Sequence, residues 1–228
     1  LDGHCPGMNG RLLNAYVTAG IQSEHECTTV EEAREKLRAG MTIFIREGTA
    51  TRNLLPLLPL ITPQNHTSIC FCTDDRVPAS LLDDGSIDYM IRVAIEHGID
   101  PLMAIRMGTI NTARHFGLKK YGAVAPGRYA DLVVFSDLHN LVPEMVFRGG
   151  QLVAQGGAML TNTPELRPYD LRSTMNVRAN DLDLKIAAPS DRVRVIGATG
   201  DQIVTDHLIE GATIVDGYAV ADTVRDLL

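Results

Sequence analysis

The chain has 228 residues, 45% of them hydrophobic, so it can bury a sizeable core and is not intrinsically disordered. Acidic residues outnumber basic ones by 28 to 21, and the net charge of -7 argues against a protein that binds nucleic-acid backbones. Four cysteines without a Cys-x-x-Cys pair indicate reduced thiols, and no apolar run reaches the ~18 residues that a membrane span needs. We therefore expect a cytoplasmic protein that contacts neither nucleic acid nor membrane.

The first 120 residues alternate helical patterns with short apolar runs. The spacing of hydrophobic residues predicts helices over residues 11–19, 29–40, 51–60, 87–97 and 100–118. Strands are predicted over residues 21–25, 41–46 and 68–73. Thr29 and Glu32 have the spacing of a capping box, and Asp100-Pro101 is a strong helix start. Pro56 should shorten or kink the helix that contains it.

Polar residues follow the apolar runs of this half of the chain. His4, His25, Glu47 and Asp74 each come just after such a run. Apolar strands that alternate with helices indicate a parallel sheet covered by helices. In an α/β barrel, residues at the carboxyl ends of the strands converge on one mouth, whereas an open doubly wound sheet gives a similar pattern over one crevice. The sequence favours the barrel.

The pattern changes after Gly122. Short strands are predicted over residues 130–135, 144–147 and 151–154, and Gly149-Gly150 is a hairpin turn signal. Residues 156–170 resemble a linker, and further strands are predicted over residues 193–196 and 202–205. We interpret this half as structural, because it contains few chemically active motifs.

His4, His25 and the adjacent pair Asp74-Asp75 are the candidate chemical groups. Imidazole and carboxylate are suitable ligands for a divalent transition metal, and adjacent carboxylates can also move protons. Alone, each feature is weak, since a loop histidine is usually solvated and an Asp-Asp pair often caps a helix. Their position at the ends of consecutive strands favours a functional site.

Other polar residues have structural explanations. Arg46-Glu47 either fixes a loop as an ion pair or contacts a ligand, and the sequence leaves both alternatives open. The alternating charges of the helix over 29–40, Lys36 among them, are expected to form a solvated face. Three cysteines are expected to be buried thiols that pack beneath or beside the site: Cys27, Cys70 and Cys72.

Several motifs resemble those of the bacterial adenine deaminases, a family within the amidohydrolase superfamily of metal-dependent barrel hydrolases. The resemblance rests on the segments 2–7, 19–26, 45–48 and 72–76. It implies an α/β fold in which residues 1–121 form the C-terminal half of a (β/α)8 TIM-type barrel. The chain would then correspond to an incomplete part of an adenine deaminase. A β-rich sandwich segment over 122–160 and the start of a C-terminal domain over 161–228 would follow.

The resemblance also implies a site and a reaction. His4, His25 and Asp74 would bind metal, and Asp74 would also move protons. Asp75 would be catalytic and would hydrogen-bond the purine ring, and Glu26 would be catalytic. The remaining members of the site wall, expected to bind substrate, are Arg46 and Glu47. The implied cofactor is a binuclear divalent centre of manganese or iron(II), the substrate a small purine, and the assembly a homo-oligomer. The reaction would be hydrolytic deamination of adenine to hypoxanthine and ammonia.

Three departures and two alternatives accompany this expectation. No two of the seven histidines are one residue apart, as the superfamily's first barrel strand requires, and Cys5 and Ser86 replace residues that relatives tend to have. The same metal ligands would serve an amidohydrolase that opens a cyclic amide such as a hydantoin, dihydropyrimidine or imidazolone. A truncated chain without catalytic activity is the other alternative. The surroundings of His4, His25 and Glu47 favour the deaminase.

Overall fold

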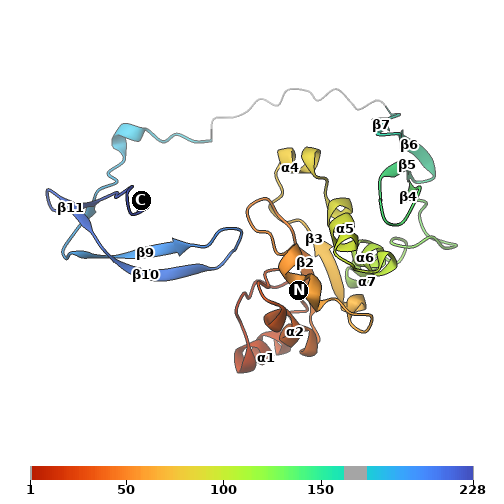
Figure 1. The fold of residues 1–228 in the computed structure, drawn as a ribbon, viewed down its shortest axis with the longest axis horizontal. Coiled ribbons are helices and arrows are strands. Elements are labelled where there is room, and N and C mark those ends of the chain that lie inside the picture. The colour runs from red at the N-terminus through yellow and green to blue at the C-terminus, as the bar shows by residue number, and fades with distance from the viewer. Residues whose placement is uncertain (1, 162–173, 228) are drawn as a thin grey trace. The chain divides into compact units, whose positions relative to one another are not determined.

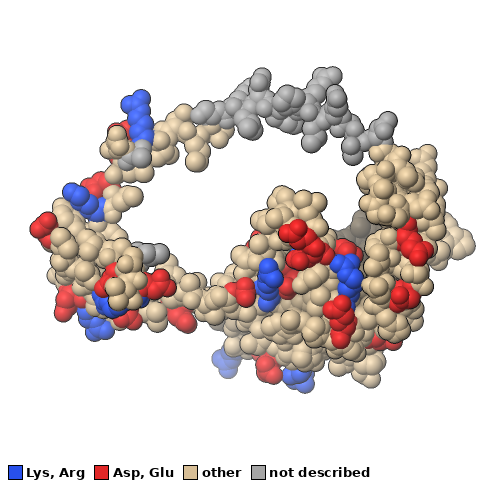
Figure 2. Space-filling model, turned by 45° about the horizontal axis from the view of Figure 1, so that its top comes forward, with Lys and Arg blue, Asp and Glu red and all other residues tan. Residues whose placement is uncertain are grey.

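The structure is a computed structural model that describes residues 2–161 and 174–227. It divides into two units, one formed by Leu1–Asn162 with Gly200–Ile203, the other by Thr163–Thr199 with Val204–Leu228. Among the described residues, no helix is long and apolar enough to cross a membrane. On the face shown in Figure 2, acidic and basic side chains are intermixed.

A parallel sheet of three strands organises the first unit (Figure 1). The strands are β1 (Ser23–Glu24), β2 (Thr42–Arg46) and β3 (Ile69–Cys72), in the order β1-β2-β3. Glu24 lies opposite Ile43, and Arg46 lies opposite Cys72. Parallel pairing places the carboxyl ends of all three strands at the same edge of the sheet, as the sequence predicted.

Helices connect and cover these strands. They are α1 (Gly10–Thr18), α2 (Val30–Arg38), α3 (Leu54–Leu57), α4 (Pro78–Asp83), α5 (Ile87–Glu96), α6 (Pro101–Gly108) and α7 (Ile110–His115), with 3-10 turns η1 (Leu58–Leu60) and η2 (His66–Ser68). The Thr29 side chain caps α2 by accepting the Glu32 N–H, and Asp100 caps α6 in the same way. Both predicted helix starts are confirmed.

The core lies between the sheet and these helices. Ile43, Ile45 and Ile69 of the strands are completely buried, and α5 contributes Met90 and Ala94 at helical spacing. α2 contacts β2, while α5, α6 and α7 contact β3. The helical cover on a parallel sheet is the arrangement expected of α/β proteins, so this part of the predicted fold class is confirmed.

The barrel is not closed. The described parallel strands, β1 to β3, form one open sheet, and closure of a barrel needs a full circle of tilted strands. His4 was expected to follow a barrel strand, but residues 2–9, the described part of the segment before α1, form no strand of this sheet. The structure is therefore a partial barrel fold.

The predicted helix over 100–118 is interrupted at Thr109, which separates α6 from α7. The Thr109 hydroxyl donates to the Ile105 carbonyl at 2.7 Å, a local bond that competes with helix propagation. Gly108 allows α5 to approach closely, because a Cβ atom there would lie 2.8 Å from both Ile87 and Ile91. The predicted helix over 51–60 is also shorter, with α3 passing into η1 where Pro59 lacks an amide donor.

An antiparallel sheet follows in the first unit. It contains β4 (Leu132–Phe135), β5 (Pro143–Arg148), β6 (Gln151–Gln155) and β7 (Ala158–Met159), in chain order. The predicted turn is confirmed, since Gly149 and Gly150 adopt φ of 56° and 82°, values that favour glycine.

The second unit contains two small antiparallel sheets. One pairs β9 (Arg192–Ala198) with β10 (Thr205–Gly211). The other contains β8 (Ile186–Ala187), β11 (Thr213–Val215) and β12 (Tyr218–Val220), in the order β11-β12-β8. A 3-10 turn, η3, spans Ala179–Asp181. The strand predicted over 202–205 is wrong, because β10 begins only at Thr205, where it pairs with Ala198 of β9. Residues 162–170 of the predicted linker lie outside the described residues.

Candidate metal centre and active site

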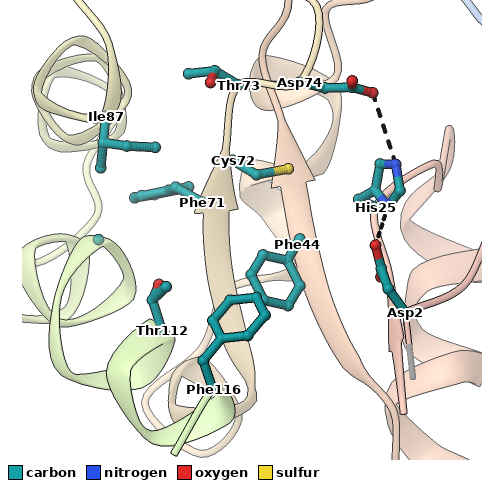
Figure 3. A pocket seen from close by; sticks show the side chains of 11 residues that line it. Asp2, His25, Phe44, Phe71, Cys72, Thr73, Asp74, Ile87, Thr112 and Phe116 are labelled. Carbon is teal, nitrogen blue, oxygen red and sulfur yellow. Dashed lines mark ion pairs between the residues drawn. The ribbon is translucent and has the colours of Figure 1, made fainter. Parts of the chain in front are cut away.

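Three parallel strands deliver the central side chains of the site. His25 follows β1, Arg46 is the last residue of β2, and Asp74 lies two residues beyond β3. Asp74 adopts φ of 52°, a left-handed conformation that aspartate tolerates better than most residues. Figure 3 shows His25 with Asp74 on one side of its ring and Asp2 on the other.

Among the described residues, two histidines and a carboxylate form a close group of potential metal ligands. One ligand atom from each of Asp2, His4 and His25 lies within 4.8 Å of the other two. The centroids of the two imidazole rings are 4.6 Å apart, with an angle of 79° between the rings. The sequence indicated both histidines, but we did not predict Asp2, although an extended segment places residues i and i+2 on one side.

His25 lies between two carboxylates. Its Nε2 atom is 3.7 Å from Asp74 Oδ2, and its Nδ1 atom is 3.6 Å from Asp2 Oδ2. Burial acts to raise the pKa of Asp2, but hydrogen bonds from the Ser23 hydroxyl and the Gly3 amide outweigh it and lower that pKa. The Asp2 carboxylate is thus held in its charged form beside the ring.

A buried arginine links the two halves of the site. Arg46, only 3% exposed, pairs through Nη1 with Asp74 Oδ2, and the same atom is 3.8 Å from Glu26 Oε1. Glu26 Oε1 also lies 3.2 Å from His4 Nδ1, and this hydrogen bond raises the pKa of His4. Within the described residues, Arg46 Nε and Nη2 are buried without a hydrogen-bond partner.

Glu47 and Asp75 lie at the same edge of the sheet but bond to the following loop. Glu47 Oε2 accepts the Leu54 N–H at 3.1 Å, and burial raises the pKa of this carboxyl. Asp75 Oδ2 accepts the Ala50 N–H at 3.1 Å. A Cβ atom at Gly48 would lie 1.6 Å from Asp75 Oδ1, so a larger residue there would displace this carboxylate. The structure therefore brings Arg46 into the central cluster and gives Glu47 and Asp75 contacts that order the loop.

The charged helix over 29–40 is not a uniformly solvated face. Lys36 is completely buried and Glu32 nearly so, which corrects the expectation from the alternating charges. The reason is geometric: Lys36 lies one turn beyond the buried Ala33 and thus faces the segment that follows His4. The three-residue helical spacing between Ala33 and Lys36 would have predicted that Lys36 is buried, but the alternating charges favoured a solvated face.

A cavity of about 440 Å³ opens beside His25 and Asp74. Its aromatic lining comes from Phe44, Phe71 and Phe116, and Cys72 adds a sulfur atom (Figure 3). Burial raises the pKa of Cys72 to about 12, so its thiol stays protonated at neutral pH. The cavity thus combines a charged wall with an apolar one, a combination typical of small-molecule sites.

The residues present fit a divalent cation. They offer imidazole nitrogens and carboxylate oxygens, the donors that zinc, iron and manganese accept, and the three atoms of Asp2, His4 and His25 already converge. Asp74 adds a carboxylate opposite His25. These side chains can hold a divalent cation at the carboxyl edge of the parallel sheet.

Comparison with known proteins places this chain in a family. Residues 1–153 match the Amidohydrolase family, and the chain belongs to that family, whose membership implies metal dependence. The chain is 45% identical over 230 residues to an adenine deaminase of Kosmotoga olearia and 44% identical over 228 residues to one of Desulfatibacillum aliphaticivorans. Both alignments cover 100% of this chain and 40% of the relative, so the chain spans about two fifths of these curated relatives. The resemblance that the motifs indicated is confirmed.

A solved structure supports the fold. The chain superposes on the β-aspartyl dipeptidase of Fervidobacterium islandicum AW-1, determined with a β-Asp-Leu dipeptide, with a TM-score of 0.53. The match covers 70% of this chain and 49% of the dipeptidase at 18% sequence identity. It supports a partial amidohydrolase fold and carries no information about the substrate.

Proposed function

We propose that the protein to which this chain belongs hydrolyses adenine to hypoxanthine and ammonia with a divalent metal centre. The observation that carries the proposal is the similarity of the whole chain, at 45% identity, to a protein named adenine deaminase. The cluster of imidazoles and carboxylates at the sheet edge supports it, because hydrolytic deamination requires an activated water molecule and a group that moves protons.

His4, His25 and Asp74 are the proposed metal ligands, and a binuclear manganese or iron(II) centre is the proposed occupant. When bound, such a centre supplies Lewis-acid activation of water near neutral pH. Asp2 lies close enough to His4 and His25 to hold the cation or to orient His25 through its second ring nitrogen.

Proton transfer is assigned to carboxylates of this chain. Asp74, paired with Arg46, is the proposed acceptor of the water proton and its donor to the departing ammonia. Glu26 contacts both His4 and Arg46, and we assign it an assisting role in the same transfer. Arg46 orients the two acids, because its Nη1 atom lies between them.

Substrate binding is assigned to the cavity beside His25. Its phenylalanine wall suits a flat aromatic ring, and its charged wall suits polar ring atoms. Asp75 is exposed, and it accepts only one backbone amide in the described structure, so its carboxylate retains capacity for a purine N–H. Arg46 and Glu47 remain the other proposed substrate-binding residues.

The test uses the complete protein, supplied with manganese, and measures adenine consumption together with ammonia release. We expect His25→Ala and Asp74→Asn to lower kcat at least a hundredfold. His139→Ala is the matched control and should leave kcat unchanged, because the side chain of His139 is 86% exposed. A wild-type protein that leaves adenine intact and opens a hydantoin, dihydropyrimidine or imidazolone ring would refute the substrate assignment. A protein that hydrolyses none of these and retains no metal would favour a non-catalytic role.

A further inference from the structure

Glu24, the last residue of β1, has a completely buried carboxylate that the proposed reaction does not use. Its Oε2 atom accepts the Cys5 N–H at 2.9 Å and the Cys5 Sγ–H at 2.7 Å. Its Oε1 atom accepts the Glu26 N–H at 2.7 Å. One carboxylate therefore joins two segments of backbone that are far apart in the sequence.

These two segments carry the candidate metal-binding histidines. Cys5 directly follows His4, and Glu26 directly follows His25, so each Glu24 oxygen is bonded one residue away from a histidine. The two imidazole rings lie 4.6 Å apart. The spacing of the rings thus depends on backbone positions that Glu24 fixes.

Lys36 provides the countercharge from α2. Its Nζ atom donates to the Cys5 carbonyl at 2.7 Å and to Glu32 Oε1 at 2.7 Å, and it lies 3.9 Å from Glu24 Oε2. Glu32 Oε1 also accepts the Gly7 N–H at 2.7 Å. Charges are costly in a protein interior unless they are paired and hydrogen-bonded, and every member of this network is.

We propose that Glu24 is a positioning residue that sets the separation and orientation of His4 and His25, with Lys36 as its buried counterion. The proposal rests on the proposed function in one respect, namely that these histidines bind the metal. It differs from a general stabilising role because the carboxylate bonds to the two peptide groups adjacent to the ligands. Loss of a group that orients metal ligands without binding the metal itself typically weakens metal affinity by ~10–100-fold.

Glu24→Gln is the informative substitution. Glutamine keeps the size of the side chain, but its NH2 group would face a backbone N–H at Cys5 or Glu26, and two donors cannot bond to one another. We expect one of the two backbone segments to move away from the side chain of residue 24 and the histidine rings to move apart. Glu31→Gln on the same helix as Lys36 is the control, since Glu31 is 82% exposed.

The experiment uses the full 228-residue chain with isotope-labelled histidine. In the metal-free chain, proton NMR should show a nuclear Overhauser contact between the His4 and His25 rings, retained in Glu31→Gln and lost or strongly reduced in Glu24→Gln. Calorimetric titration with Mn²⁺ should then show affinity about 10–100-fold weaker in Glu24→Gln and unchanged in Glu31→Gln. Retention of both the ring contact and the affinity in Glu24→Gln overturns the proposal.

Two further outcomes separate this proposal from the proposed function. If the wild-type chain shows the ring contact and Glu24→Gln loses it, but neither binds Mn²⁺, positioning by Glu24 stands and the metal assignment fails. If affinity falls while the ring contact persists, Glu24 does not act through histidine spacing. Should circular dichroism show that Glu24→Gln is unfolded, the double variant Glu24→Gln/Lys36→Met removes the charges of Glu24 and Lys36 together, and the same measurements decide.

Discussion

Replacing Lys36 with methionine tests whether the buried charge network holds the first unit together. Lys36 is completely buried, and its ammonium group contacts the Cys5 carbonyl, the Glu32 carboxylate and the Glu24 carboxylate. Methionine has a similar length and no charge, so packing is largely retained while all three polar contacts are lost. The substitution therefore isolates the electrostatic contribution.

The expected loss of stability follows from the polar groups that Lys36→Met leaves without a partner. Two carboxylates and one carbonyl would stay in the interior without their shared donor. Removal of one partner from a buried ion pair typically costs about 3–5 kcal/mol, because the other charge is left uncompensated. Since domains are stable by only about 5–15 kcal/mol, the loss would be a large fraction of the total. We therefore expect Lys36→Met to lower the free energy of unfolding by about 3–5 kcal/mol.

Hydrogen exchange of the β2 amides measures the free energy of unfolding of the first unit, independently of the second unit. Protection at Ile43 and Ile45, both completely buried, should fall by the factor that corresponds to this free energy. Lys119→Met is the control, and a change at this exposed lysine should stay within about 0.5 kcal/mol. Adding Glu24→Gln to Lys36→Met should restore part of the loss. A loss below about 1 kcal/mol for Lys36→Met would refute the reasoning, since surface ion pairs are worth that much.

Three further predictions each concern a single side chain. Burial raises the pKa of Glu47 above its ordinary value of 4.5, so the folded state holds the proton more tightly and stability falls as pH rises from 4.5 through the raised pKa. Urea unfolding from pH 4 to 7 should show this fall in wild type relative to Glu47→Gln, and a pH-independent difference would contradict it. Asn111→Ala should destabilise by about 2–4 kcal/mol in urea, because the His66 and Ile69 carbonyls both lose their donor, and a loss below about 1 kcal/mol would contradict this. Cys72, whose pKa is raised to about 12, should react with an aromatic disulfide far more slowly in the native than in the unfolded chain, as peptide mass spectrometry can show, and equal rates would contradict the raised pKa.

The strand ends were predictable because they follow from local pattern and parallel pairing alone. Short apolar runs predict β1, β2 and β3, and parallel pairing brings the residues after them to one edge. His25, Arg46 and Asp74 meet there for that reason. The helix caps at Thr29 and Asp100 were equally local and are confirmed.

Features that depend on contacts between distant segments were not predictable in this way. The alternating charges of α2 indicated a solvated face, yet Lys36 is buried because the segment after His4 packs over it. Thr109 breaks a continuous helical pattern, since α5 approaches α6 at Gly108 and the Thr109 hydroxyl bonds to its own helix. Closure of the barrel depends on pairing among many strands, which no local pattern reports.

The acids around the histidines divide into two kinds, and the division gives the site its chemistry. The Glu24 carboxylate accepts backbone amides with both oxygens and is balanced by Lys36, so it builds the site and is not free to bind a cation. Asp2, Glu26 and Asp74 instead face imidazoles, and Arg46 is the buried cation that contacts the latter two. The three carboxylates outnumber the single guanidinium, so the cluster has a negative potential, which favours a divalent cation over a neutral ligand. The sequence segments that resemble adenine deaminases thus contain both kinds of acid: Glu24, which bonds to the backbone, and the acids that face the imidazoles.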